Sequence, residues 1–146
     1  MLNSSSKSLV KLKWFENEDL VISFNDDNMD DIVIRKPTSP SPKGGTEARK
    51  LLAASLAKCM SSTLFSLLKS NNVEFSNFTV NAETVTGEGD NGTLHVHSIN
   101  LTISLNLPHD EVTRRKFKGI KKIFDRGCLL SRSLKNGVSI NTNIKV

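Results

Sequence analysis

The spacing of the apolar residues changes abruptly at Thr46, and this change limits the folds open to the chain. Before Thr46, three short segments alternate apolar and polar residues, at 9–14, 19–24 and 31–36. Beyond it, apolar residues recur every three or four positions as far as Leu68. Alternation is typical of strands and the longer spacing of helices. The sequence therefore predicts an antiparallel β-meander over 1–36 and a long helix that begins near Thr46, its N-cap.

The rest of the chain continues this mixed pattern. Two β segments joined by a turn rich in Gly, Asp and Asn predict a hairpin over 74–107. A helix over 110–126, a short helix over 129–136 that stops at Gly137, and a strand over 138–146 follow. The predicted order is βββ-α-ββ-α-α-β. This is an α+β fold with antiparallel sheets packed on a long central helix, and 146 residues suffice for one domain, 1–146. Within it, 1–36 form the meander and 46–146 the helix and sheet body.

The loop over 37–45 connects the meander to this body. It holds three of the four prolines and so cannot continue a strand or begin a helix before Thr46.

The chain has two cysteines, Cys59 on the apolar stripe of the long helix and Cys128 at the start of the short one. Two are too few for a disulfide scaffold. The first residues lack the apolar run of a signal peptide, and no segment approaches the roughly 20 apolar residues of a membrane span. We therefore expect a cytoplasmic protein that does not bind membranes. Thiols are kept reduced in the cytoplasm, so the pair is catalytic, redox-active or metal-binding, or consists of two inert core thiols.

Two segments carry a resemblance to a known family. "GGTEARKLLAASLAKCMSSTL" resembles the first cysteine segment of the OsmC/Ohr family, the osmotically induced protein C and organic hydroperoxide resistance proteins. There a glycine, a short spacer, Pro-Glu-Leu-Leu and alanines precede a cysteine in a long helix. "GCLLSRSLKNGVSINTNIKV" resembles the second segment, in which Cys-Pro-Val-Ser leads into a short helix and a final strand. The order of elements also fits, so the resemblance covers most of the chain.

The resemblance implies an activity and an assembly. The activity is thiol-dependent reduction of organic hydroperoxides without a cofactor. By position, Cys59 is the peroxidatic cysteine that becomes a sulfenic acid, and Cys128 resolves it to a disulfide that a dithiol reductant reopens. The assembly is an intertwined homodimer, with cysteines and arginine of one site supplied by different chains.

A peroxidatic thiol also needs a lowered pKa, which an apolar helix alone would raise. In the family the cation is an arginine from the amino-terminal part, held by a glutamate ten residues before the cysteine. Here Arg49 stands at the glutamate's position, so the candidate cations are Arg49 itself and Arg35 at the end of the third predicted strand. Both can equally be solvated surface charges. Leu129 and Leu130 replace the family's Pro-Val after the second cysteine.

Two other interpretations of the sequence, a metal site and a binding module, rest on different residues. His95 and His97 lie two apart on a predicted strand and face one side, but no further local ligand joins them, so we expect no metal. The helix over 113–126 is basic and amphipathic, which fits a module with inert thiols that binds an anionic or nucleic-acid partner. Aromatic residues make up only 5% of the chain and tyrosine is absent, so we do not expect nucleic-acid binding.

Overall fold

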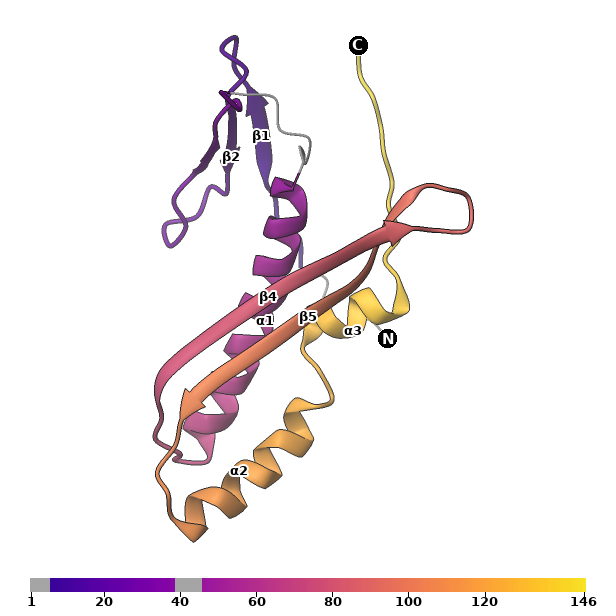
Figure 1. Ribbon diagram of the computed structural model, residues 1–146. Coiled ribbons are helices and arrows are strands. Elements are labelled where there is room, and N and C mark those ends of the chain that lie inside the picture. Colours follow the sequence, from indigo (N-terminus) through magenta and orange to yellow (C-terminus); the bar gives the residue numbers. More distant parts are fainter. Residues whose placement is uncertain (1–5, 39–45) are drawn as a thin grey trace. The chain divides into compact units, whose positions relative to one another are not determined.

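The structure is a computed structural model that describes residues 6–38 and 46–146 (Figure 1). Most of the predicted loop over 37–45, with both glycines of the first family-like segment, lies outside the described residues. The chain divides into two compact units, residues 1–47 and 48–146. Each unit is described separately below.

The first unit holds the predicted meander. Strands β1 (Lys11–Trp14), β2 (Leu20–Ser23) and β3 (Ile32–Ile34) pair antiparallel in that order. Leu20 pairs with Trp14 on one side and with Ile34 on the other. The alternation places Leu20 and Ile22 in the interior, whereas Trp14 is 70% exposed. A three-stranded sheet is thus confirmed, with strands shorter than the sequence pattern indicated.

The second unit is built on α1 (Glu47–Ser70), the predicted long helix. Strands β4 (Ser76–Glu88) and β5 (Leu94–Asn106) form the predicted antiparallel hairpin, which lies across α1 in Figure 1. On β5 the apolar residues at 99, 101, 103 and 105 are half-buried, and the polar residues between them are exposed. One face of the hairpin therefore covers helices and the other faces solvent, as expected of an antiparallel sheet.

Four buried residues form the core: Leu64 and Leu68 of α1, Val73 after it, and Ile120 of α2 (Glu111–Phe124). Leu68 is fully buried, and burial of a leucine side chain contributes about 1.5–3 kcal/mol. Half-buried residues of α1, β4, β5 and α2, and Leu107 just after β5, surround this core: Leu67, Phe78, Ile103, Leu105, Leu107, Phe117 and Phe124. The core thus fixes α1, the hairpin and α2 against one another.

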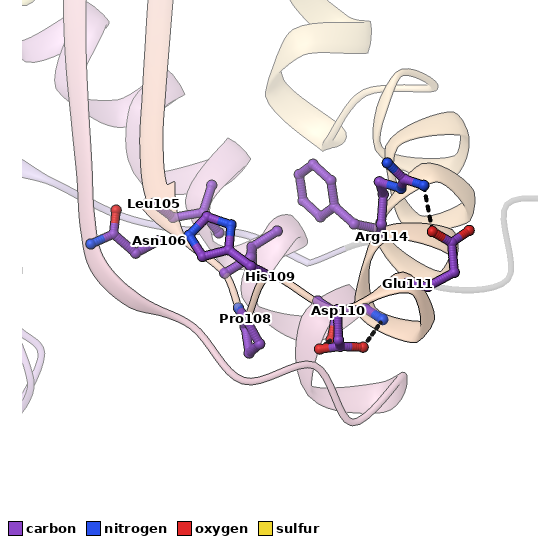
Figure 2. A pocket seen from close by; sticks show the side chains of 10 residues that line it. Leu105, Asn106, Pro108, His109, Asp110, Glu111 and Arg114 are labelled. Carbon is purple, nitrogen blue, oxygen red and sulfur yellow. Dashed lines mark hydrogen bonds and ion pairs between the residues drawn. The ribbon is translucent and has the colours of Figure 1, made fainter.

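The start of α2 is capped by its own side chains (Figure 2). Asp110 accepts hydrogen bonds from the backbone N–H of Thr113 at 2.8 Å and from its hydroxyl at 2.7 Å. Glu111 forms an ion pair with Arg114 one turn later. A cavity of about 640 Å³ lies beside these groups, but both of its carboxylates are already engaged in the helix. We therefore regard this region as structural.

Of the last two predicted elements, the short helix forms and the final strand does not. α3 spans Leu129–Asn136, the same residues as the predicted short helix. The predicted strand over 138–146 does not form in the structure, where Ile140 and Ile144 are 88% and 82% exposed. Alternating apolar residues make a strand only where a neighbouring strand accepts and donates the backbone hydrogen bonds. Among the described residues, no strand pairs with this segment.

The length and composition of α1 correct the expectation that no segment could span a membrane. An 18-residue window of α1 has a mean hydropathy of 1.5, so by length and composition the helix could cross a membrane, contrary to the sequence prediction. A core helix of a soluble protein passes the same test. Here Ala53, Leu56, Leu64 and Leu68 of α1 are buried in the second unit, and 22% of this window is buried.

Candidate thiol site

The fold brings together the two cysteines, which lie 69 positions apart in the sequence. Cys59 projects from the middle of α1 and is half-buried. Cys128 is the N-cap residue of α3, is 4% exposed, and is also a free thiol. Each thiol contributes to the pKa shift of the other, so the two side chains lie close together. The central helix and the last helix therefore meet at a pair of reduced sulfurs.

Local backbone geometry places Cys128 at this point. Gly127 has a φ of +84°, a conformation that residues with a side chain rarely adopt, and a Cβ there would lie 2.4 Å from Ser131 Oγ. Cys128, the next residue, is the N-cap of α3 and forms a capping box with Ser131. The N–H of Ser131 donates to Cys128 Sγ at 3.4 Å, and the N–H of Cys128 donates to Ser131 Oγ at 2.8 Å. The Cys128 sulfur is thus held at the positive end of a helix.

The pKa values of the two thiols are displaced in opposite directions. Burial raises the pKa of Cys59, and the nearby Cys128 thiol raises it further, whereas the backbone of Leu130 and Leu129 lowers it. Burial also acts to raise the pKa of Cys128, but the nearby Cys59 thiol and the N–H of Ser131 outweigh it, so this pKa is lowered. Of the two sulfurs, Cys128 is the better placed to carry a negative charge.

Each candidate arginine has a hydrogen-bond partner within its own unit. Arg49 Nη1 donates to Thr86 Oγ1 of β4 at 3.1 Å and is half-buried. Arg35 belongs to the first unit, where its Nη1 lies 3.0 Å from the Asp19 carboxylate. Within the first unit, Asp19 therefore holds Arg35. The causes that dominate both thiol pKa shifts are burial, the partner sulfur and backbone N–H groups.

An apolar cavity of about 590 Å³ is lined by residues close in the sequence to both cysteines, although neither cysteine lines it. It lies between α1, β5 and the region of α3, and includes Met60, Gly127 and Ser131, neighbours of the two cysteines. Its other lining residues are mostly apolar: Leu52, Leu56, Val96, His97, Ser98, Ile99, Leu101, Phe124, Asp125, Leu134 and Lys135. Sequence reasoning missed this cavity. The i, i+4, i+8 series of Leu52, Leu56 and Met60 on the predicted helix was the signal for its wall.

The histidines lie on the hairpin. The rings of His95 and His97 are stacked with centroids 6.3 Å apart, and His95 Nδ1 lies 3.0 Å from the Thr93 carbonyl oxygen. Within residues 6–38 and 46–146, no group of three or more His, Cys, Asp or Glu side chains is arranged to hold a metal ion. His97 instead lines the apolar cavity.

The family assignment follows from the sequence and agrees with this geometry. The family model described as OsmC-like protein matches residues 41–143. The chain belongs to the OsmC-like family. The resemblance of the two cysteine segments is thereby confirmed, and no curated protein sequence matches this OsmC-like chain.

Solved structures show the same fold for the OsmC-like chain. An OsmC-like protein from Mycoplasma pneumoniae superposes with a TM-score of 0.66 at 16% identity, covering 90% of this chain and 89% of that chain. An OsmC-like protein of unknown function from Vibrio cholerae gives 0.63 at 16% identity, covering 88% and 92%. The organic hydroperoxide resistance protein OhrB of Bacillus subtilis gives 0.50 at 18% identity, covering 87% and 89%. These likenesses confirm the α+β fold.

Proposed function

We propose that this OsmC-like protein reduces organic hydroperoxides with Cys59 and Cys128. The observation that supports the proposal is the closeness of the two reduced thiols, Cys59 in α1 and Cys128 at the start of α3, with an apolar cavity lined by residues next to them in the sequence. A single buried thiol would serve packing alone, but a pair in contact can form and reopen a disulfide. OhrB, a solved relative with this fold, is an organic hydroperoxide resistance protein.

The reaction needs only the two sulfurs, the peroxide and a reductant. Cys59 attacks the outer peroxide oxygen, so an S–O bond forms, the O–O bond breaks, and the alcohol leaves with a proton. Cys59 is now a sulfenic acid. Cys128 attacks this sulfur, forming the S–S bond and releasing water. A dithiol reductant then restores both thiols by exchange. The apolar cavity would take the organic part of the substrate.

Arg49 and Arg35 remain the candidate cations for Cys59. The variant Arg49→Glu separates them. It restores the family's glutamate and should speed peroxide reduction if Arg35 activates the thiol, whereas it should slow the reaction if Arg49 does. Thr86→Val is the matched control, because it removes the hydrogen bond to Arg49 and keeps the guanidinium charge.

The direct test counts free thiols before and after one equivalent of an organic hydroperoxide. We expect both thiols to be consumed and mass spectrometry to find an intramolecular disulfide between them, which requires Cα atoms within roughly 7 Å. Cys128→Ser should leave Cys59 as a sulfenic or more oxidised acid, and Cys59→Ser should abolish turnover. Two thiols that survive excess peroxide would show that they serve packing.

One further observation supports a second candidate function, a binding module for an anionic partner. The surface of α2 and of the residues just after it is basic and exposed: Arg114, Arg115, Lys116, Lys118, Lys121, Lys122 and Arg126. Glu111 neutralises part of it through ion pairs with Arg114 and Arg115. If the protein binds a polyanion at low salt and this binding is lost at about 200 mM salt, the basic face is a nonspecific electrostatic surface. Salt-resistant, selective binding would favour this function over the peroxidase.

A further inference from the structure

The positive charge of the chain is concentrated on α2 and the residues next to it. Residues 110–126 hold seven of the 20 Lys and Arg residues but only three of the 15 acidic residues. The remaining 13 basic and 12 acidic residues nearly balance, so most of the net charge of +5 lies in this one segment. A local excess of one sign creates a field that attracts partners of the opposite charge.

The cations of α2 lie on the side of the helix that faces away from the core. Arg114, Lys118 and Lys122 recur every four residues, so they follow one side of the helix at steps of about 6 Å along its axis. Phe117 and Ile120, on the opposite side, belong to the core. We call this exposed row and its neighbours the cationic stripe: Arg114, Arg115, Lys118, Lys121, Lys122 and Arg126.

The cationic stripe is neutralised only at its beginning. Glu111 forms ion pairs with Arg114, as Figure 2 shows, and with Arg115. Among the described residues, no carboxylate forms an ion pair with Lys118 or Lys122. Like charges four residues apart repel each other and destabilise a helix. The stripe therefore carries a repulsion that an acidic surface would relieve.

Apolar side chains beside the stripe favour a protein as the source of that acidic surface. Val112 and Ile123 of α2 are exposed, and so is Leu129 just beyond it. Interfaces between proteins combine such apolar contacts with a charged rim. The aromatic residues of α2, Phe117 and Phe124, pack against the core, so α2 offers no ring to stack on a base or to enter a lipid surface.

The stripe ends next to the two thiols. Arg126 is followed by Gly127 and then by Cys128, which lies close to Cys59. Cys59 is half-buried, whereas Cys128 is 4% exposed, so Cys59 is the more accessible of the two sulfurs. A protein bound to the stripe would therefore cover residues that lead directly into the thiol site.

We propose that the cationic stripe of α2 docks an acidic protein that carries the dithiol which reopens the Cys59–Cys128 disulfide. The transfer of electrons rests on the proposed peroxide chemistry, but the docking does not. The proposal gives the basic face and the thiols one shared purpose. It also makes the charge of the reductant, and not only its dithiol, a determinant of the reaction.

The exchange needs only the two thiols of the docked partner. One partner thiolate attacks the Cys59 sulfur of the disulfide, so a mixed disulfide forms and Cys128 leaves as a thiolate. The second partner thiolate attacks the partner sulfur of the mixed disulfide, and Cys59 leaves. The partner's dithiol is thereby oxidised to a disulfide, and Cys59 and Cys128 gain two electrons and the two protons of that dithiol. Docking raises the effective concentration of the dithiol at Cys59.

The test uses two synthetic peptides that carry the same Cys-Gly-Pro-Cys dithiol, one flanked by glutamates and the other by lysines. The protein is first oxidised to the disulfide with a chemical oxidant, and its reduction by each peptide is followed at low salt. Each rate is divided by the rate with dithiothreitol, an uncharged dithiol that reports the reactivity of the disulfide itself. Fluorescence anisotropy of the same peptides, labelled and with serine in place of cysteine, measures docking without any thiol chemistry.

We expect the parent protein to bind the glutamate peptide more tightly and to react with it at least about tenfold faster than with the lysine peptide, because opposite charges steer association. Lys118→Glu combined with Lys122→Glu should abolish or reverse this preference. Lys50→Glu combined with Lys69→Glu, two exposed positions of α1, changes the net charge equally and should keep it. Circular dichroism checks the fold, and the milder pair Lys118→Gln with Lys122→Gln should lose part of the preference.

Several outcomes would overturn the proposal. Equal rates and equal binding for the two peptides would do so, and so would equal losses in the α1 and α2 variants. Tighter binding of single-stranded DNA or of phosphatidylserine vesicles through Lys118 and Lys122 would assign the stripe to a different partner. Docking that gives no gain in rate would overturn the delivery of electrons. Docking through the stripe by a protein whose thiols do not react with peroxide would refute only the proposed function.

Discussion

Among single residues, Asp19 links two parts of the first unit, because it binds the end of the β3 segment and holds the candidate cation Arg35. Its carboxylate accepts hydrogen bonds from the N–H of Lys36 at 2.9 Å and from Arg35, and these contacts lower its pKa. A lowered pKa adds stability above the unfolded-state value of 3.8, and this stability is lost as the pH falls through the folded-state value. Asp19→Asn should therefore lower the melting temperature at pH 7, and the gap to the parent protein should close on acidification. Asp27→Asn is the control, and a gap that does not change with pH would contradict this account.

Gly127 gives a second prediction for a single residue. Gly127→Ala forces a side chain into a backbone of φ +84° and against Ser131 Oγ, so it should cost more than the roughly 1–2 kcal/mol of the left-handed conformation alone. Gly92→Ala is the matched control, because Gly92 has a φ of +70° and nothing within 4 Å of the added Cβ. Urea denaturation measures both. If both substitutions lower the free energy of unfolding equally, the close approach of Ser131 Oγ does not contribute to the stability loss of Gly127→Ala.

Among the elements, α3 depends on a cysteine where helices usually have Ser, Thr, Asp or Asn. Sulfur is a weak acceptor, and Cys128 Sγ lies 3.4 Å from the Ser131 nitrogen. Cys128→Ser should keep the cap and change the free energy of unfolding little, whereas Cys128→Ala should lower it by about 1 kcal/mol. Denaturation of both variants under reducing conditions tests this. Equal losses would mean that burial of the sulfur, and not capping, stabilises α3.

The elements also show where sequence reasoning succeeds. The period of apolar residues predicts α1, the hairpin and α2, because one face of each is buried in a shared core. The bounds of α3 follow from Cys128 and Gly137, two local signals. The contact between Cys59 and Cys128 could only be suggested by the family resemblance, because spacing along the chain carries no distance in space. The partner of Arg35 is Asp19, just before β2, and the partner of Arg49 is Thr86 on β4, and neither pairing had a local signal in the sequence.

At the scale of the whole molecule, several large apolar side chains that proteins usually bury are exposed to solvent. Leu12 and Trp14 of β1 are 56% and 70% exposed, and Ile140 and Ile144 protrude from the unpaired segment 138–146. Exposed apolar residues gathered on one strand or segment are typical of contact surfaces. The alternation in 138–146 further suits a strand that pairs only when a partner edge is available.

We therefore expect a homodimer in solution, as the family resemblance implies. Light scattering at micromolar concentration should give twice the 16.1 kDa mass of the chain. The double variant Ile140→Asn with Ile144→Asn should shift the protein toward monomer, because it removes apolar surface without touching α3. Ser139→Asn with Asn143→Ser, on the alternate positions of the same segment, is the control and should leave the dimer intact. A parent protein that is monomeric at this concentration would contradict the prediction. It would also require each chain to carry a complete site, because no second chain would then be present to supply an arginine to Cys59.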